Sequence, residues 1–243
     1  MATQLIDTET AQEFMRETIE KVSPADLAEM TDALERKSAI FADRLEAARL
    51  ARADRADLRV VLRNVFATRR RADAILDDIG VERLAGEIEQ LLRGLAPLPL
   101  RFEQFQAVLV DHPGAAFDLP SELLHFTYPD HYWLWARWMW NPHSETGSLA
   151  LVIDESYDFG DDDPGVTYMR IGEAIAFVSE TGRAAGFAAI GSGPFGVDVF
   201  LGCVYAVYMY TVLRLRMTQE FNRIVPPQPE LVSRLLGVHN LEV

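Results

Sequence analysis

Three histidines and the carboxylates near them in sequence have the side-chain types that bind zinc or iron. They are His125, His131 and His143, with Glu122, Asp130 and Glu145. His125 and His131 lack the i, i+4 spacing of a helical ligand pair, and the chain contains no H-E-x-x-H motif. We therefore expect no metal site. If a metal does bind, these three histidines are the candidate ligands. The other interpretation is a buried His125 that bonds to backbone near Pro129.

A glycine-rich loop, Gly191-Ser-Gly-Pro-Phe-Gly196, satisfies the G-x-G-x-x-G pattern through Gly191, Gly193 and Gly196. It follows a possible short strand at 187–190 and opens an expected helix over 197–223. Glycine amides and a helix N-terminus together favour a bound phosphate. A dinucleotide fold also needs a second strand with an acid after it, and too little chain follows. The alternative is a close-packing turn or a plain loop.

All four tryptophans lie within eight positions, Trp133 to Trp140. Read as a helix, the run is aromatic on every side, and such a helix has to be buried. On that helix Trp133 and Trp140 flank Arg137 at i−4 and i+3, which allows cation–π stacking of the two rings on the guanidinium. The functional interpretation is an aromatic cage or a stacking platform for a planar ligand. The alternative is an aromatic ladder in the interior or at an interface, with the arginine covering it.

Arginines form a stripe with steps of three and four residues: Arg52, Arg55, Arg59 and Arg63, with Arg70 further on. On a helix they share one face. They could bind a phosphate, a nucleic acid or an acidic partner. The alternative is a solvated face that pairs with Asp54, Asp57 and the acids of a neighbouring helix.

Six carboxylates lie within ten residues: Asp154, Glu155, Asp158, Asp161, Asp162 and Asp163. Oxygen ligands at this density suit calcium or magnesium, but the spacing does not fit a D-x-D-x-D-G loop. Two other interpretations stay open. The run is a solvated loop whose last aspartate caps the next helix, or it docks on the arginine stripe in the same chain or a neighbouring one.

Helical elements must position these groups, and residues 1–94 have the composition of a charged helical bundle or hairpin. Ser23-Pro24-Ala-Asp26 is typical of a helix start, and apolar residues follow at helical spacing to Leu45. A second apolar pattern runs from Leu58 to Ile79, and a third from Val81 to Gly94. The segment 95–99 reads as a linker.

Residues 100–243 predict a more apolar, tryptophan-rich helical domain. We expect a short helix over 102–110, an aromatic helix that starts near Pro129 and ends before Asn141, and helices over 197–223 and 230–236. Asp163-Pro164 marks another helix start. One strand, 149–153, pairs with 166–169 in a minor hairpin.

The formal net charge of −14 argues against nucleic acid as the main partner. The chain has one cysteine, Cys203, in an apolar helix where we expect an inert packing residue. This usage and the polar N-terminal residues predict a cytoplasmic protein, and the arginine-rich composition suggests a bacterial source. The apolar run Val199–Leu213 would span about 22 Å as a helix, less than the ~30 Å bilayer core, so we expect a buried helix.

The run Leu123-Leu-His-Phe-Thr-Tyr-Pro-Asp-His-Tyr132 resembles a turn in some helical proteins of bacterial restriction and DNA-glycosylase-like families. In those proteins an apolar L-H-F precedes P-[DE]-x-[YF]. The resemblance covers about ten of the 243 residues. The acid that those families place after the tyrosine is replaced here by Trp133-Leu-Trp135, so no function is carried over.

Together these patterns predict a mostly α-helical protein with at most a minor β-hairpin. No nucleophile motif such as G-x-S-x-G is present, and neither catalytic residues nor a cofactor can be named. We expect a non-catalytic interaction or accessory subunit that packs into a homo- or hetero-oligomer, because aromatic residues concentrate at interfaces. The alternative is an enzyme or sensor that binds an anionic, phosphate-bearing molecule at Gly191–Gly196.

Overall fold

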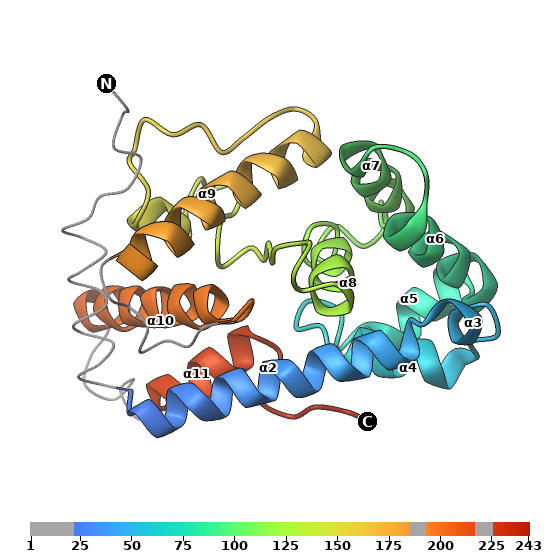
Figure 1. The fold of residues 1–243 in the computed structure, drawn as a ribbon, viewed down its shortest axis with the longest axis horizontal. Helices are drawn as coiled ribbons and strands as arrows, with labels where there is room; N and C mark the ends of the chain where they lie inside the picture. The colour runs from blue at the N-terminus through green and yellow to red at the C-terminus, as the bar shows by residue number, and fades with distance from the viewer. Residues whose placement is uncertain (1–21, 185–192, 217–225) are drawn as a thin grey trace. The chain divides into compact units, whose positions relative to one another are not determined.

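A computed structural model describes residues 22–184, 193–216 and 226–243 (Figure 1). These residues form α-helices and no β-strand, which confirms the predicted mostly-α fold. The helices are α2 (Pro24–Arg44), α3 (Ala47–Leu50), α4 (Arg55–Arg63), α5 (Ala72–Ile79), α6 (Val81–Arg93), α7 (Leu98–Val108), α8 (Asp118–Thr127), α9 (Pro164–Ala184), α10 (Gly196–Arg216) and α11 (Gln228–Leu235), with a 3-10 turn η1 at Leu149–Leu151.

The chain folds into two compact units. Unit 1 takes its described residues from Met1–Leu34, Arg137–Asp158 and Ala174–His239. Unit 2 contains Glu35–Ala136, Phe159–Glu173 and Asn240–Val243. Both units are discontinuous in sequence, and the long helices α2 and α9 contribute residues to each. The predicted boundary at 95–99 stays a prediction.

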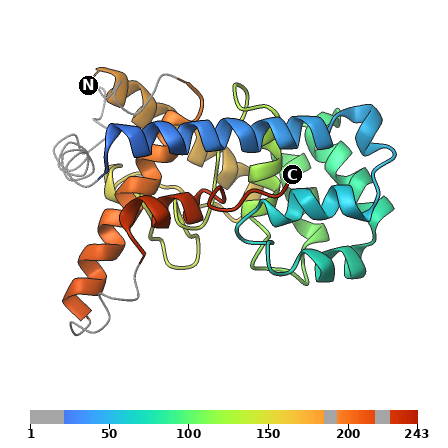
Figure 2. The same ribbon diagram turned by 90° about the horizontal axis from the view of Figure 1, so that it is seen from below.

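Helix α2 begins where its sequence predicts. The Ser23 hydroxyl accepts a hydrogen bond from the Asp26 amide at 3.1 Å, and the Asp26 carboxylate accepts from the Ser23 amide at 3.2 Å. This reciprocal pair satisfies two amides that a helix start leaves without partners. The helix then runs unbroken to Arg44 (Figure 2, blue). Apolar residues at the predicted helical spacing, from Leu27 to Leu45, are buried.

In unit 2 consecutive helices pack on one another: α4 on α5, α5 on α6, and both α6 and α7 on α8. The third apolar pattern is confirmed as α6, which buries Leu84, Ile88, Leu91 and Leu92. The second pattern forms two helices, α4 and α5, and ends at Gly80, whose φ of +85° suits glycine. The linker is shorter than predicted, because α7 begins at Leu98.

The tryptophan run is buried from Trp135 onward, with Trp133 half-buried, but the predicted aromatic helix is wrong. Residues 132–136 have no regular secondary structure and 137–139 form a turn, while Leu134 to Trp140 are buried apart from a half-buried Arg137. Side chains of neighbouring helices satisfy this irregular backbone. The Ser121 hydroxyl accepts from the Trp135 amide, and the Tyr168 hydroxyl donates to the Trp133 carbonyl at 2.9 Å. Helical hydrogen bonds are therefore unnecessary for burial here.

The Trp133 indole lies against the first half of α9. Its Nε1 donates to the Tyr168 carbonyl at 2.8 Å, and the Trp133 and Tyr168 rings stack with centroids 4.8 Å apart. Gly172 makes this approach possible, because a Cβ at that position would lie 2.2 Å from Trp133 Cε2. The glycine is thus required for close helix–indole packing, a role that needs no special backbone conformation.

The predicted minor hairpin is absent from the described residues. Residues 149–151 form the 3-10 turn η1, and 166–169 lie inside α9. The β-type pairing in the described chain is an isolated bridge between Asn141 and Thr146. The apolar run at 149–153 has no second strand to pair with, so its backbone bonds locally instead.

In unit 1, α10 packs on α11. Gly202 lets the two helices approach, since its Cβ position lies 3.1 Å from Val232 Cγ1. Both helices fit their predicted positions, and residues 217–223 of the first lie outside the described residues. Among the described helices none is long and apolar enough to cross a membrane.

Candidate functional site

Helix α8 is buried along its whole length and carries three ionisable residues, Asp118, Glu122 and His125. Their i, i+4 and i+7 spacing places them on one side of the helix. Lys37 of α2 faces them: its Nζ lies 2.5 Å from Glu122 Oε2, and the lysine side chain is 0% exposed. The same ammonium lies 4.1 Å from the Phe126 ring centroid. Sequence spacing alone could not reveal this pair, because its members are 85 residues apart.

Burial dominates the electrostatics of this cluster. It raises the pKa of Glu122 to about 7, against the lowering effect of Lys37, and the nearby Asp118 charge raises it further. His125 Nδ1–H donates to the Tyr132 carbonyl at 2.8 Å. This confirms the interpretation of a buried His125 bonded to backbone near Pro129. All four ionisable residues of the cluster are buried, so it belongs to the core of unit 2.

The remaining metal candidates are not brought together. His131 and His143 are exposed and belong to different units. Within the described ranges no group of three His, Cys, Asp or Glu residues could hold a metal ion. Cys203 is buried, and burial raises the pKa of its thiol to about 12, as expected of a packing residue.

The predicted stacking set loses its geometric basis, because Trp133, Arg137 and Trp140 are not on a helix. Trp133 belongs to unit 2, and Arg137 and Trp140 to unit 1. Binding of a planar ligand by these residues stays a prediction.

The glycine loop lies partly outside the described residues, which include Gly193 and Gly196 but not Gly191. Helix α10 begins at Gly196, close to the predicted start. Its first turn contains Asp198, which is buried. A carboxylate already occupies the electropositive end of this helix, so a bound anion would meet a negative group there. Phosphate binding at this loop stays a prediction.

The acidic run is organised by local contacts. Asp163 Oδ1 accepts from the Gly165 amide at 2.7 Å and from the Val166 amide at 3.3 Å, so it caps α9 as the capping interpretation predicts. Asp161 pairs with Arg170 at 2.9 Å, and Asp154 accepts from Ser156. These bonds favour a loop that starts a helix.

The arginine stripe pairs with carboxylates of unit 2. Arg55 contacts Asp73 at 3.3 Å and Asp77 at 2.7 Å, and Arg59 contacts Asp73 at 3.1 Å. Hydrogen bonding from Arg59 lowers the pKa of the Asp73 carboxyl. Arg52 instead donates to the Ala48 carbonyl. These contacts fit the interpretation of a solvated face paired with a neighbouring helix, here α5. The other expected partners have different roles, since Asp57 pairs with Arg44 and Arg49, and Asp54 caps α4. Whether the stripe also binds a partner stays a prediction.

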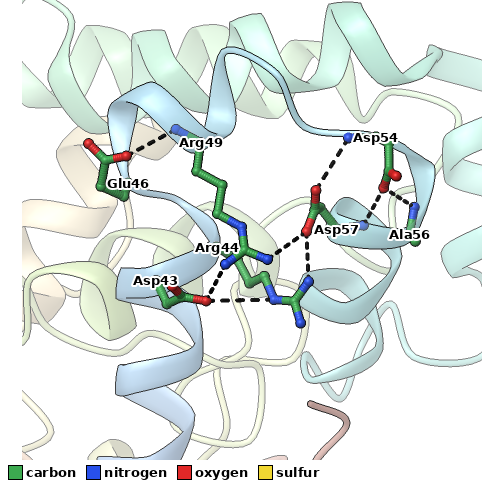
Figure 3. A network of polar contacts seen from close by, with 7 residues as sticks. All are labelled: Asp43, Arg44, Glu46, Arg49, Asp54, Ala56 and Asp57. Atoms are coloured by element: carbon green, nitrogen blue, oxygen red, sulfur yellow. Dashed lines mark hydrogen bonds and ion pairs between the residues drawn. The ribbon is translucent and has the colours of Figure 1, made fainter.

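A second network joins the end of α2 to α3 and α4 (Figure 3). Asp57 Oδ1 lies 2.6 Å from Arg44 Nη1 and 2.9 Å from Arg49 Nη2. Burial alone would raise the pKa of Asp57, but the hydrogen bonds from both arginines lower it. Asp54 caps α4 by accepting from the Ala56 amide at 2.8 Å. Asp57 thus fixes the turn between α2 and α4.

Residues at the end of α4 and in the loop after it hold a distant segment of the chain, residues 240–242. Asn64 is 1% exposed, and its amide group bonds twice to Glu242: Nδ2 donates to the backbone carbonyl and Oδ1 accepts from the backbone amide, both at 2.8 Å. Arg63 Nε lies 2.5 Å from Glu242 Oε1. Arg69 donates to the Asn240 carbonyl. We call Arg63, Asn64 and Arg69 the α4 clamp.

Sequence reasoning identified Arg63 but missed Asn64 and Arg69. Asn64 directly follows the last residue of α4, inside the apolar pattern from Leu58 to Ile79 that the sequence analysis left undivided. Its partner is 178 residues away in sequence. The chemistry of the clamp is recognition of an extended backbone together with an acidic side chain.

No family model matches the chain, and neither a curated protein nor a solved structure matches it.

Proposed function

We propose that this chain is a non-catalytic helical interaction subunit that assembles with itself or with another protein. The observation that supports the proposal is the surface of the α4–α5 loop. Phe66 is 55% exposed there, and Arg70 and Arg71 of the same loop are also exposed. Aromatic and arginine side chains are enriched at protein interfaces and contribute strongly to binding.

The loop is also suited to an acidic partner. The chain as a whole carries a net charge of −14, whereas Phe66 lies between Arg63 and the run Arg69–Arg71. A local basic patch on an acidic protein steers a complementary acidic surface toward it. The chain has a single cysteine, as is common in proteins of reducing compartments, and we propose a cytoplasmic location on that basis.

The test is the oligomeric state and partner binding of purified wild-type protein and Phe66→Ser. Light scattering after gel filtration, over a range of concentrations, should show an assembly that Phe66→Ser weakens at least tenfold. Val110→Ser is the matched control, because Val110 is 74% exposed but lies two residues after α7 and not in the α4–α5 loop. The proposal is wrong if two results occur together. The protein is a strict monomer at every concentration, and it binds no partner in an assay with both components purified.

The alternative function, binding of a phosphate-bearing molecule at Gly191–Gly196, is tested separately by thermal shift with nucleotides and phosphorylated metabolites. A ligand at 100 times its dissociation constant adds about 2.7 kcal/mol of stability. Absence of any shift with this panel would exclude that function.

A further inference from the structure

We propose that the α4 clamp is a binding site for an extended peptide segment with an acidic side chain, supplied by another protein chain. The inference rests on the proposed interaction function and names the chemistry of the partner. In the structure, residues 240–243 of this chain occupy the clamp themselves, so the bound segment shows what the site accepts.

The backbone of the bound segment is recognised by one buried side chain. The Asn64 amide supplies one donor and one acceptor to the same residue, Glu242. Only a residue with an extended backbone presents its N–H and C=O to one side in this way. This part of the recognition is independent of sequence, because every residue except proline carries both groups.

Arg63 supplies the side-chain specificity, and Arg69 adds a backbone contact. Arg63 contacts the Glu242 carboxylate, and Arg69 fixes the carbonyl of Asn240, two residues earlier. Arg63 and Glu242 are each about one-third exposed, so a competing segment can reach the pair. Arg63 accordingly selects a carboxylate at the position that the Asn64 amide holds.

The occupying segment competes with any ligand in trans. A tethered segment has an effective concentration in the millimolar range. A peptide of the same sequence must therefore bind wild-type protein weakly. A substitution that releases residues 240–243 will expose the clamp in the full-length chain. Glu242→Pro does this, because proline lacks the amide that donates to Asn64 and removes the carboxylate that contacts Arg63.

The experiment measures fluorescence anisotropy of a labelled peptide with the sequence of residues 237–243. We expect Glu242→Pro protein to bind this peptide at least ten times more tightly than wild type. A peptide with glutamine in place of its glutamate should bind Glu242→Pro protein at least five times more weakly. If Glu242→Pro binds the peptide no more tightly than wild type, the proposal is wrong.

Two further substitutions, each made in the Glu242→Pro protein, assign the contacts. Asn64→Ala should weaken peptide binding at least tenfold, and Arg63→Ala should remove the preference for glutamate over glutamine. Arg52→Ala is the matched control, because Arg52 bonds to its own turn and should leave affinity within twofold. If Asn64→Ala fails to fold by circular dichroism, the Arg63→Ala measurement decides, and an unchanged glutamate preference overturns the site.

Light scattering separates this inference from the proposed function. A dimer of wild-type protein that Glu242→Pro abolishes would identify residues 240–243 of a second copy as the acidic segment, which supports the site. An assembly that persists in Glu242→Pro, together with no peptide binding, would overturn the clamp as a binding site and leave the interaction function in place.

Discussion

Two ion pairs of unit 2 use similar charges in opposite surroundings. Lys37–Glu122 is enclosed, with side-chain exposures of 0% and 5%, whereas Arg59–Asp73 is open, with 40% and 55%. Inside the protein each charge has lost its water and depends on its partner, while on the surface water can replace either partner. The difference teaches that burial, more than the distance between the charges, decides how much a pair matters to the fold.

The largest effect should follow from removing one member of the enclosed pair. Lys37→Met leaves the Glu122 carboxyl buried without its cation, and we expect a loss of about 3–5 kcal/mol in the free energy of unfolding. Urea denaturation measures it. The double variant Lys37→Met with Glu122→Leu should recover most of that loss, since the pair then leaves no buried charge behind. A single variant as stable as wild type would contradict the comparison.

Packing sharpens the contrast between enclosed and open positions. Gly172→Ala places a methyl group into the stacked, hydrogen-bonded Trp133 indole and should cost about 3 kcal/mol, at the upper end for overpacking. Gly86 is the matched control, because a Cβ there meets nothing within 4 Å and the residue lies in the middle of α6. Gly86→Ala should stabilise by about 0.5–1 kcal/mol. Thermal and urea unfolding measure the stability of both variants. If Gly172→Ala is as stable as Gly86→Ala, the indole moves aside freely and the prediction is wrong.

The enclosed pair should also make stability depend on pH. The pKa of Glu122 is raised from 4.5 to about 7, so the folded protein binds its proton more tightly than the unfolded chain. The stabilisation from this group is complete below pH 4.5 and is lost as the pH rises toward 7. Relative to Glu122→Gln, wild type should lose about 2 kcal/mol between about pH 5 and pH 8. Parallel pH profiles for the two proteins would show that the carboxyl titrates normally.

The smallest effect belongs to the open pair. Arg59→Ala should change the free energy of unfolding by less than about 1 kcal/mol, and salt at about 1 M should reduce the change further. Urea denaturation of Arg59→Ala, Asp73→Ala and the double variant isolates the pair's coupling energy. A coupling energy as large as that of Lys37 with Glu122 would break the comparison.

The elements with local signals were predictable from sequence. Ser23 and Asp26 indicate the start of α2, and Asp163 indicates the start of α9. The spacing of Leu84, Ile88 and Leu91 predicts α6. Each of these signals depends on residues within about one or two turns of each other, so a single sequence contains all the necessary information.

The tryptophan run shows where such signals end. Its aromatic content predicts burial of most of the run, but burial does not determine whether the backbone is helical or irregular. That choice depends on Ser121, His125 and Tyr168, whose side chains satisfy the irregular backbone. The α4 clamp could not be predicted for the same reason. Asn64 and Glu242 are 178 residues apart, and only the folded chain brings them into contact.

The division of the chain also sorts its indoles into two pairs, with Trp133 and Trp135 in unit 2 and Trp138 and Trp140 in unit 1. Trp135 is completely enclosed, and Trp133 stacks on Tyr168. Replacing either pair with phenylalanine would leave an intrinsic fluorophore reporting on one unit at a time. The protein thus carries its own optical labels for asking whether its two halves melt in one transition or two.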